Sequence, residues 1–292
     1  MKALVIGGSG FLGSHISDAL SESNYAVKIY DLNPSEWIKE NQSFVQGDIS
    51  DLVALEKEIK NADIVYHMAG IADIAESNND PLQTISDNIM GSANIISLCA
   101  KHSVRLMYGS TIYVYSKHGS FYRASKQAVE TLIEVFHEEK NLRYTILRFG
   151  SLYGPRSQIW NGLRRIVTEM INKKEIKFGG TGREKREYIH VLDAARMSVE
   201  LLSDEYLSKA VTLTGIQVLS QAELLETIKE IMGTDISISF NEDSTSHAHY
   251  KLTPYQYVPK SSIKHISSEY VDIGQGILEL ISEISNESNS SE

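Results

Sequence analysis

The sequence predicts an α/β protein with a doubly wound parallel sheet and a smaller C-terminal α/β lobe. The chain begins with a short apolar run at residues 3–6, which suits a strand covered on both faces. A glycine-rich turn then leads into a helical pattern of apolar residues. Short apolar runs and helical segments alternate in this way up to residue 149, as they do in parallel sheets. With 292 residues, 42% of them hydrophobic, the chain can form such a domain and a companion lobe.

The first half of the chain supplies the elements of the large domain. Further strands are expected at residues 25–30, 44–49, 62–70 and 104–111, and helices at residues 52–59, 88–101 and 122–136. Ser50 or Asp51 can cap the first of these helices, because both side chains accept hydrogen bonds from backbone N–H groups.

The second half of the chain is less regular. We expect helices at residues 159–172, 190–202 and 221–232, and strands at 175–178, 211–214 and 236–240. Residues 1–155 and about 186–210 are assigned to a Rossmann domain, and about 156–185 and 211–284 to a substrate-binding lobe. The polar residues 285–292 are expected to form a disordered tail.

The turn after the first strand has the glycine spacing of a dinucleotide site. Gly7, Gly10 and Gly13 follow the pattern G-x-x-G-x-x-G, and Gly8 with the last two also fits G-x-G-x-x-G. In both patterns the glycines let a pyrophosphate approach the N-terminus of the following helix. The expected cofactor-binding residues of this turn are Gly7, Gly10, Phe11, Leu12 and Gly13.

An acidic residue follows at the distance expected for ribose binding. Asp31 ends the second strand, 18 residues after Gly13, and Leu32 comes next. A carboxylate there accepts hydrogen bonds from the adenosine ribose and repels a 2′-phosphate, so the site should favour NAD over NADP. The strand at 62–70 ends in Met68, Ala69 and Gly70, which we expect to bind the cofactor. The small residues of this segment let the cofactor lie close to the strand.

Two Tyr-x-x-x-Lys patterns follow the fifth strand, which ends at Thr111. Tyr122 and Lys126 lie in a segment of helical period, so their side chains share one face. Tyr113 and its lysine lie at the exit of the strand, where this spacing brings nothing together. Ligands bind beyond the carboxyl ends of such strands, and we therefore expect Thr111, Tyr122 and Lys126 to lie where the ligand chemistry takes place.

Taken in order, the motifs resemble those of the extended short-chain dehydrogenase/reductases, in particular the nucleotide-sugar epimerases and dehydratases. The resemblance covers nearly the whole chain and rests on residues 7–13, 47–49, 67–70, 88 with 91, 110–111 before 114–115, 122–126, 147–149 with 153–156, 180–182 and 186–193. It implies that Tyr122 is the acid/base, that Lys126 binds the nicotinamide ribose and that Thr111 binds the reacting hydroxyl.

The resemblance also implies further binding residues. Asp48 and Ile49 would hold the adenine, and Arg186 would bind the diphosphate of the substrate. Ser151 stands where the family has an asparagine near the substrate, and Phe178 can stack on the base or serve as a core residue. The family also implies a homodimer in which helices 88–101 and 122–137 of each subunit form a four-helix interface.

Departures from the family pattern narrow the expected chemistry. The Asp-Glu pair that follows the threonine of the 4,6-dehydratases is Ile112 and Tyr113 here, and the carboxylate of the decarboxylases is also missing. A 4-epimerase or a 4-ketoreductase remains, because both need hydride transfer without additional proton chemistry. A dinucleotide-sensing module without catalysis is the third hypothesis. The family's C-terminal Arg-x-Gly-Asp element is replaced by the Tyr- and Pro-rich residues 250–259.

Composition excludes several other classes of protein. The net charge of −10 argues against nucleic acid as a partner, because phosphate backbones select basic surfaces. Cys99 is the only cysteine, so we expect neither an intrachain disulfide nor a cysteine metal site. We find no cleavable leader and no apolar run long enough to span a bilayer, and expect a cytoplasmic protein.

Overall fold

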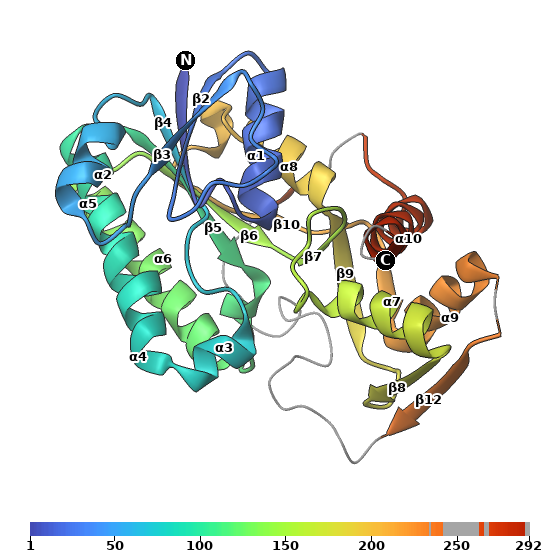
Figure 1. The fold of residues 1–292 in the computed structure, drawn as a ribbon. Helices are drawn as coiled ribbons and strands as arrows, with labels where there is room; N and C mark the ends of the chain where they lie inside the picture. Colours follow the sequence, from blue (N-terminus) through green and yellow to red (C-terminus); the bar gives the residue numbers. More distant parts are fainter. Residues whose placement is uncertain (234, 242–262, 266–268, 290–292) are drawn as a thin grey trace.

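An eight-stranded parallel sheet forms the centre of the larger lobe in the computed structural model, which describes residues 1–233, 235–241, 263–265 and 269–289 (Figure 1). The strand order is β13-β10-β6-β5-β4-β1-β2-β3, and every neighbouring pair is parallel. The strands are β1 Lys2–Ile6, β2 Ala26–Asp31, β3 Gln42–Gln46, β4 Ile64–His67, β5 Arg105–Thr111, β6 Tyr144–Phe149, β10 Lys209–Leu213 and β13 Ile263–His265. The predicted doubly wound α/β fold is confirmed.

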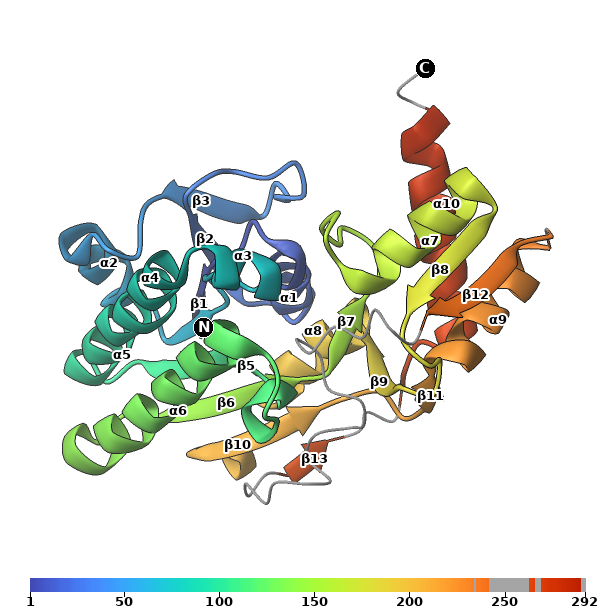
Figure 2. The same ribbon diagram turned by 90° about the horizontal axis from the view of Figure 1, so that it is seen from below.

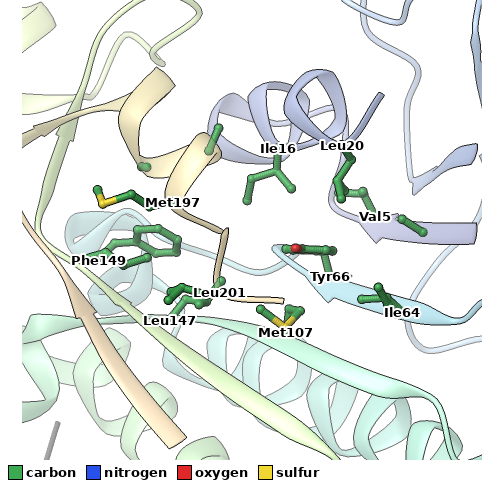
Figure 3. Close-up of a cluster of buried hydrophobic side chains, with 14 of the residues drawn as sticks. Val5, Ile16, Leu20, Ile64, Tyr66, Met107, Leu147, Phe149, Met197 and Leu201 are labelled. Carbon is green, nitrogen blue, oxygen red and sulfur yellow. The ribbon is translucent and has the colours of Figure 1, made fainter. Parts of the chain in front are cut away.

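Helices cover both faces of this sheet. Helices α1 (Phe11–Glu22) and α8 (Val191–Glu200) pack on one face, and α2 (Leu52–Ile59), α5 (Ser92–Lys101) and α6 (Ser120–Lys140) pack on the other. Successive residues of a strand point to opposite faces. Val5 therefore packs in one cluster with Ile16 and Leu20 of α1 (Figure 3), whereas its neighbours Leu4 and Ile6 pack on α2.

Several short helices lie between the longer elements of the larger lobe. They are α3 (Ile74–Asn79), α4 (Pro81–Thr84), the π-helix η1 (Ile85–Gly91) and the 3₁₀ helix η2 (Ile112–Tyr115); a further 3₁₀ turn, η3 (Asp204–Tyr206), precedes β10. The single helix expected at residues 88–101 is therefore a π-turn that continues into α5.

The smaller lobe lies beside the larger one (Figure 2) and has an apolar core of its own. Its elements are β7 Ser151–Tyr153, α7 Gly162–Lys173, β8 Glu175–Gly179, β9 Lys185–His190, β11 Val218–Ser220, α9 Gln221–Met232, β12 Ser237–Asn241 and α10 Ile273–Asn289. The strands form two small sheets, β11-β9-β7 and β12-β8. Helix α7 begins later than expected because the Asn161 side chain caps it by accepting hydrogen bonds from the N–H groups of Leu163 and Arg164.

Two predictions for the second half were wrong. The strand expected at residues 211–214 of the smaller lobe is β10, which pairs with β6 in the large sheet, where Val211 and Leu213 are buried in the cluster of α1 and α8. Residues 285–289 of the expected tail belong to α10, because Ile277, Leu280 and Ile284 continue an apolar face that packs in the core of the smaller lobe. Residues 290–292 and 250–259 lie outside the described residues.

Candidate active site

The glycine turn packs tightly against the segment that follows β4. Gly7 has a φ of +82°, and a Cβ there would lie 2.7 Å from the Ala69 Cα. A Cβ at Gly13 would overlap the Gly7 carbonyl group, so α1 can approach the turn only with glycine at this position. A Cβ at Gly10, in contrast, would meet only the Gly7 carbonyl oxygen, at 3.4 Å, so the turn is open on this side.

Helix α1 presents free backbone donors at the open side of the turn. Gly10 is its N-cap residue and has no side chain that could accept hydrogen bonds from the first turn. Phe11 is buried and Leu12 is partly buried, which anchors the start of the helix on the sheet. The Ser9 hydroxyl is buried and has no partner among the described residues. Such a helix N-terminus suits an anionic ligand.

Asp31 lies beside this turn at the end of β2. One of its carboxylate oxygens accepts a hydrogen bond of 3.0 Å from the Ser9 N–H, and the other is 3.5 Å from the Asn33 nitrogen. The first bond fixes the carboxylate next to the glycine turn, and the second oxygen keeps acceptor capacity for a ligand. Leu32, the next residue, is exposed.

Asp48 and Ile49 follow β3 and are held in place by contacts with β2 and η1. The Tyr30 hydroxyl donates a hydrogen bond of 2.9 Å to the Asp48 carbonyl oxygen, and the Asp48 side chain accepts one of 2.8 Å from the Ser50 N–H. Ile49 packs so closely on η1 that a Cβ at Gly91 would overlap its side chain. The predicted adenine segment therefore has a rigid backbone.

Thr111, Tyr122 and Lys126 come together at the carboxyl end of β5, as predicted. The Thr111 side chain hydrogen-bonds the Tyr122 hydroxyl. Lys126 is buried and its ammonium group donates a hydrogen bond of 2.8 Å to the Gly109 carbonyl oxygen. The same nitrogen lies 5.9 Å from the centroid of the Tyr122 ring and 4.9 Å from that of Tyr108.

The burial of this group shifts both pKa values away from the charged forms. Burial raises the pKa of Tyr122 to about 12, and the hydrogen bond from Thr111 offsets part of this effect. Burial lowers the pKa of Lys126 to about 8, with the negative charge of Glu130 acting in the opposite direction. Lys126 is therefore still predominantly charged at pH 7, and Tyr122 needs further positive charge to act as a base.

Asn88, which we had not predicted as a site residue, joins the loop after β4 to the catalytic helix. Its side chain accepts a hydrogen bond of 2.7 Å from the Ile71 N–H and donates to the Ile71 carbonyl oxygen at 2.9 Å and to the Ser125 hydroxyl at 3.0 Å. The π-turn places this side chain inward. Gly70 has a φ of +134°, and a Cβ there would lie 2.6 Å from the Asn88 amide oxygen.

A buried ion pair joins β6 to α6 beside Ser110. Arg148 of β6 binds both carboxylate oxygens of Glu130 of α6, at 3.0 and 2.8 Å. Ser110, directly before Thr111, donates a hydrogen bond of 2.6 Å to the same carboxylate. Arg148 also donates to the Tyr115 hydroxyl at 2.7 Å. The pair therefore connects the strand that carries Thr111 with the helix that carries Lys126.

The predicted substrate residues lie in the smaller lobe. Ser151 of β7 is paired with Tyr188 of β9, and Arg186 is two residues away on the same strand, so the two positions are close. Phe178 packs edge to face against Phe240, with 6.1 Å between ring centroids. The structure thus pairs it with an aromatic residue of the neighbouring strand β12.

Comparison with known proteins identifies the family. A model of the NAD dependent epimerase/dehydratase family matches residues 3–210. The chain belongs to this family. The cofactor of the epimerase/dehydratase family is NAD, and the open glycine turn, the uncapped N-terminus of α1 and the Asp31 carboxylate fit it.

Similar proteins include epimerases and decarboxylases. The putative UDP-glucose 4-epimerase of Methanocaldococcus jannaschii is 30% identical over 255 residues, which are 79% of this chain and 82% of the relative. The UDP-glucuronic acid decarboxylase 1 of Xenopus tropicalis is 24% identical over 267 residues, 82% of this chain and 62% of the longer relative. The fold resembles that of the UDP-glucose 4-epimerase from Thermotoga maritima, solved with UDP-glucose, with a TM-score of 0.84, 24% identity and coverage of 99% of this chain and 100% of that one.

The described parts of the chain contain no group of three or more His, Cys, Asp or Glu side chains placed to hold a metal ion. They also contain no helix with both the length and the apolar character needed to cross a bilayer.

Proposed function

We propose that the chain is an NAD-dependent nucleotide-sugar 4-epimerase that acts by transient hydride transfer. The observation that supports this reaction most strongly is the surroundings of Thr111, Tyr122 and Lys126. The two residues after Thr111 are Ile112, which is buried, and Tyr113, so neither supplies a carboxylate. Elimination of water needs an additional acid and base, and these positions do not provide them.

The carboxylate of Glu130 does not fill this gap. It lies one helical turn beyond Lys126, but Arg148 binds both of its oxygens and Ser110 binds one of them. Because these hydrogen bonds engage both of its oxygens, this carboxylate is not free to act as a mobile proton carrier. A decarboxylase or dehydratase reaction is therefore less well supported than epimerisation, although relatives with decarboxylase activity are similar in sequence.

In the proposed reaction Tyr122 is the acid/base. It takes the proton of the sugar hydroxyl that Thr111 holds, and later returns it. NAD held at the glycine turn would supply the hydride acceptor, and return of the hydride to the opposite face of the 4-keto sugar would invert the carbon, so one cofactor molecule would serve many turnovers. Lowering the pKa of Tyr122 from about 12 to near 7 requires about 7 kcal/mol of differential stabilisation. The Lys126 ammonium, 5.9 Å from the centroid of the ring, is the nearby positive charge of this chain that favours the phenolate.

The remaining site residues are proposed to bind cofactor and substrate. The glycine turn with Phe11 and Leu12 would hold the pyrophosphate, Asp31 and Leu32 the adenosine ribose, and Asp48 and Ile49 the adenine. The segment Met68–Gly70 would pass beside the nicotinamide half. Ser151 and Arg186 would bind the sugar and the diphosphate, and Phe178 the base. UDP-sugars are the first substrates to test, because the similar proteins named above are enzymes of UDP-sugars.

A panel of UDP-, GDP-, CDP- and dTDP-sugars, incubated with the purified protein without added cofactor, tests the proposal. An epimerase should interconvert two 4-epimers with the NAD that it retains, and chromatography of the sugars detects this. A requirement for stoichiometric NADH or NADPH would instead show a 4-ketoreductase. Absence of turnover with every sugar and keto sugar would favour a dinucleotide-sensing protein.

Replacement of Asp31 tests the cofactor preference. The variant Asp31→Ser removes the charge that repels a 2′-phosphate, so the ratio of the Kd for NADP to the Kd for NAD should fall by about tenfold or more, or about 1.4 kcal/mol. Fluorescence titration with both cofactors measures this ratio. Glu40→Ser removes an equal charge from the exposed part of the same loop and should leave the ratio unchanged. An unchanged ratio in Asp31→Ser would contradict the role of Asp31.

The homodimer implied by the family remains a proposal with a simple test. Helices α5 and α6 lie side by side on one flank (Figure 1). Two large apolar side chains near them are exposed: Met90 of η1, which precedes α5, is 59% exposed, and Val135 of α6 is 47% exposed. We expect light scattering at micromolar concentration to give about twice the chain mass of 32.6 kDa. The double variant Met90→Glu/Val135→Glu should halve this mass, and a monomeric wild type would contradict the proposal.

A further inference from the structure

Tyr113 is the one side chain of η2 that is not buried. Its neighbours Ile112, Val114 and Tyr115 are each 1% exposed and form a small apolar cluster on which Tyr113 packs. Helix η2 begins directly after Thr111, whose hydroxyl accepts a weak hydrogen bond from the Tyr113 N–H. The short helix is thereby anchored on three sides, and Tyr113 is the residue that it presents at the exit of β5.

The ring of Tyr113 lies against the ring of the proposed acid/base. The centroids of the Tyr113 and Tyr122 rings are 6.5 Å apart and their planes make an angle of 73°. This edge-to-face geometry is the favourable one for two aromatic rings and holds both in place. In the proposed function Tyr122 contacts the reacting sugar hydroxyl, so the ring that packs on Tyr122 is placed beside the sugar site.

The loop between the two tyrosines is built to leave room for this ring. Gly119 has a φ of +98°, and a Cβ there would lie 2.8 Å from the Tyr113 Cδ1 and 3.0 Å from the Arg123 Cβ. Arg123 in turn donates a hydrogen bond of 2.9 Å to the Ser116 carbonyl oxygen and closes the loop. Only 11 positions separate Thr111 from Tyr122, so the loop has little freedom to move the ring elsewhere.

We propose that the ring of Tyr113 is a wall of the sugar site and selects neutral hexoses over hexuronic acids. The inference rests on the proposed function and adds the class of sugar. An aromatic ring packs well on the C–H groups of a hexose, and its electron-rich face and neutral hydroxyl offer no positive charge to a carboxylate. A carboxylate beside the reacting carbon would lose water against this ring, which offers it no partner.

Binding to an inactive background tests the wall without relying on turnover. Tyr122→Phe keeps the ring on which Tyr113 packs, and in this background Tyr113→Phe keeps the wall whereas Tyr113→Ala removes it. Calorimetry with the NAD-loaded protein would measure the Kd of UDP, UDP-glucose and UDP-glucuronic acid. Tyr113→Ala should raise the Kd of UDP-glucose by about tenfold, as the loss of an apolar contact does, and should change the Kd of UDP by less than about twofold. Tyr113→Phe should bind all three like the background.

The preference among sugars gives the second readout. The background should bind UDP-glucose more tightly than UDP-glucuronic acid, and Tyr113→Ala should reduce that preference by about tenfold. Gly119→Ala, which displaces the ring without deleting it, should shift the preference in the same direction. An equal loss for UDP and both sugars would show a structural role, and a large effect of Tyr113→Phe would show that the hydroxyl acts. Either result overturns the inference while the proposed function stands, whereas a wild type that binds no UDP-sugar overturns both.

Discussion

Replacing Tyr122 by phenylalanine should lower turnover by about 10²- to 10⁴-fold, the usual cost of a lost general acid/base. The change removes only the phenolic oxygen that Thr111 binds, and leaves the ring that packs on Tyr113. We therefore expect kcat to fall while the Kd for NAD stays within about threefold of the wild type. Initial rates with the sugar identified in the panel, together with a titration of NAD, measure the two quantities.

The matched control is the other tyrosine of a Tyr-x-x-x-Lys pattern. Tyr113→Phe removes an oxygen from a ring of the same site, 6.5 Å away, and should change turnover by less than about tenfold. The reason is that Lys126 lies on the same face of α6 as Tyr122. Tyr113 lies on η2, a single short turn that ends at Tyr115, so no helix brings Lys117 to its side. If Tyr113→Phe were the more damaging variant, the acid/base would have to be reassigned to the exit of β5.

Local patterns were sufficient for most elements in the first half of the chain, although not for α3, α4 and the π-turn η1. Helix α2 spans Leu52–Ile59 as predicted, and the Asp51 side chain caps it by accepting hydrogen bonds from the N–H groups of Val53 and Ala54. Tyr122 and Lys126 could be placed together because four residues bring two side chains to one helix face. Both cases depend on contacts between residues close in sequence, which spacing determines.

Contacts between distant residues could not be predicted in this way. The sequence showed a strand at 211–214, but only the three-dimensional structure shows that it pairs with β6 rather than with the strands of the smaller lobe. The partners Glu130 and Arg148 lie on different elements, and their pairing depends on how α6 packs on the sheet. The one signal in the sequence for this pair was Arg148, a charged residue in the apolar strand at 144–149, because a buried charge needs a partner.

The ion pair of Glu130 and Arg148 should be a weak point of the fold if only one partner is removed. Both side chains are nearly inaccessible, at 2% and 3%. Arg148→Leu would leave a buried carboxylate with the Ser110 hydroxyl alone, and Glu130→Leu would leave a buried guanidinium bound to Tyr115. Each single variant should lose about 3–5 kcal/mol of unfolding free energy. Denaturation by urea, followed by circular dichroism, measures the loss.

The double variant separates the cost of an unpaired charge from the value of the pair itself. Glu130→Leu/Arg148→Leu leaves no buried charge, so it should be more stable than either single variant. Lys173→Ala removes the exposed pair with Glu169 and should cost less than about 0.5 kcal/mol. A double variant whose loss equals the sum of the two single losses would show no coupling between the two side chains and would contradict this account. In either case kcat should fall in the double variant if it folds, because the pair joins the strand of Thr111 to the helix of Lys126.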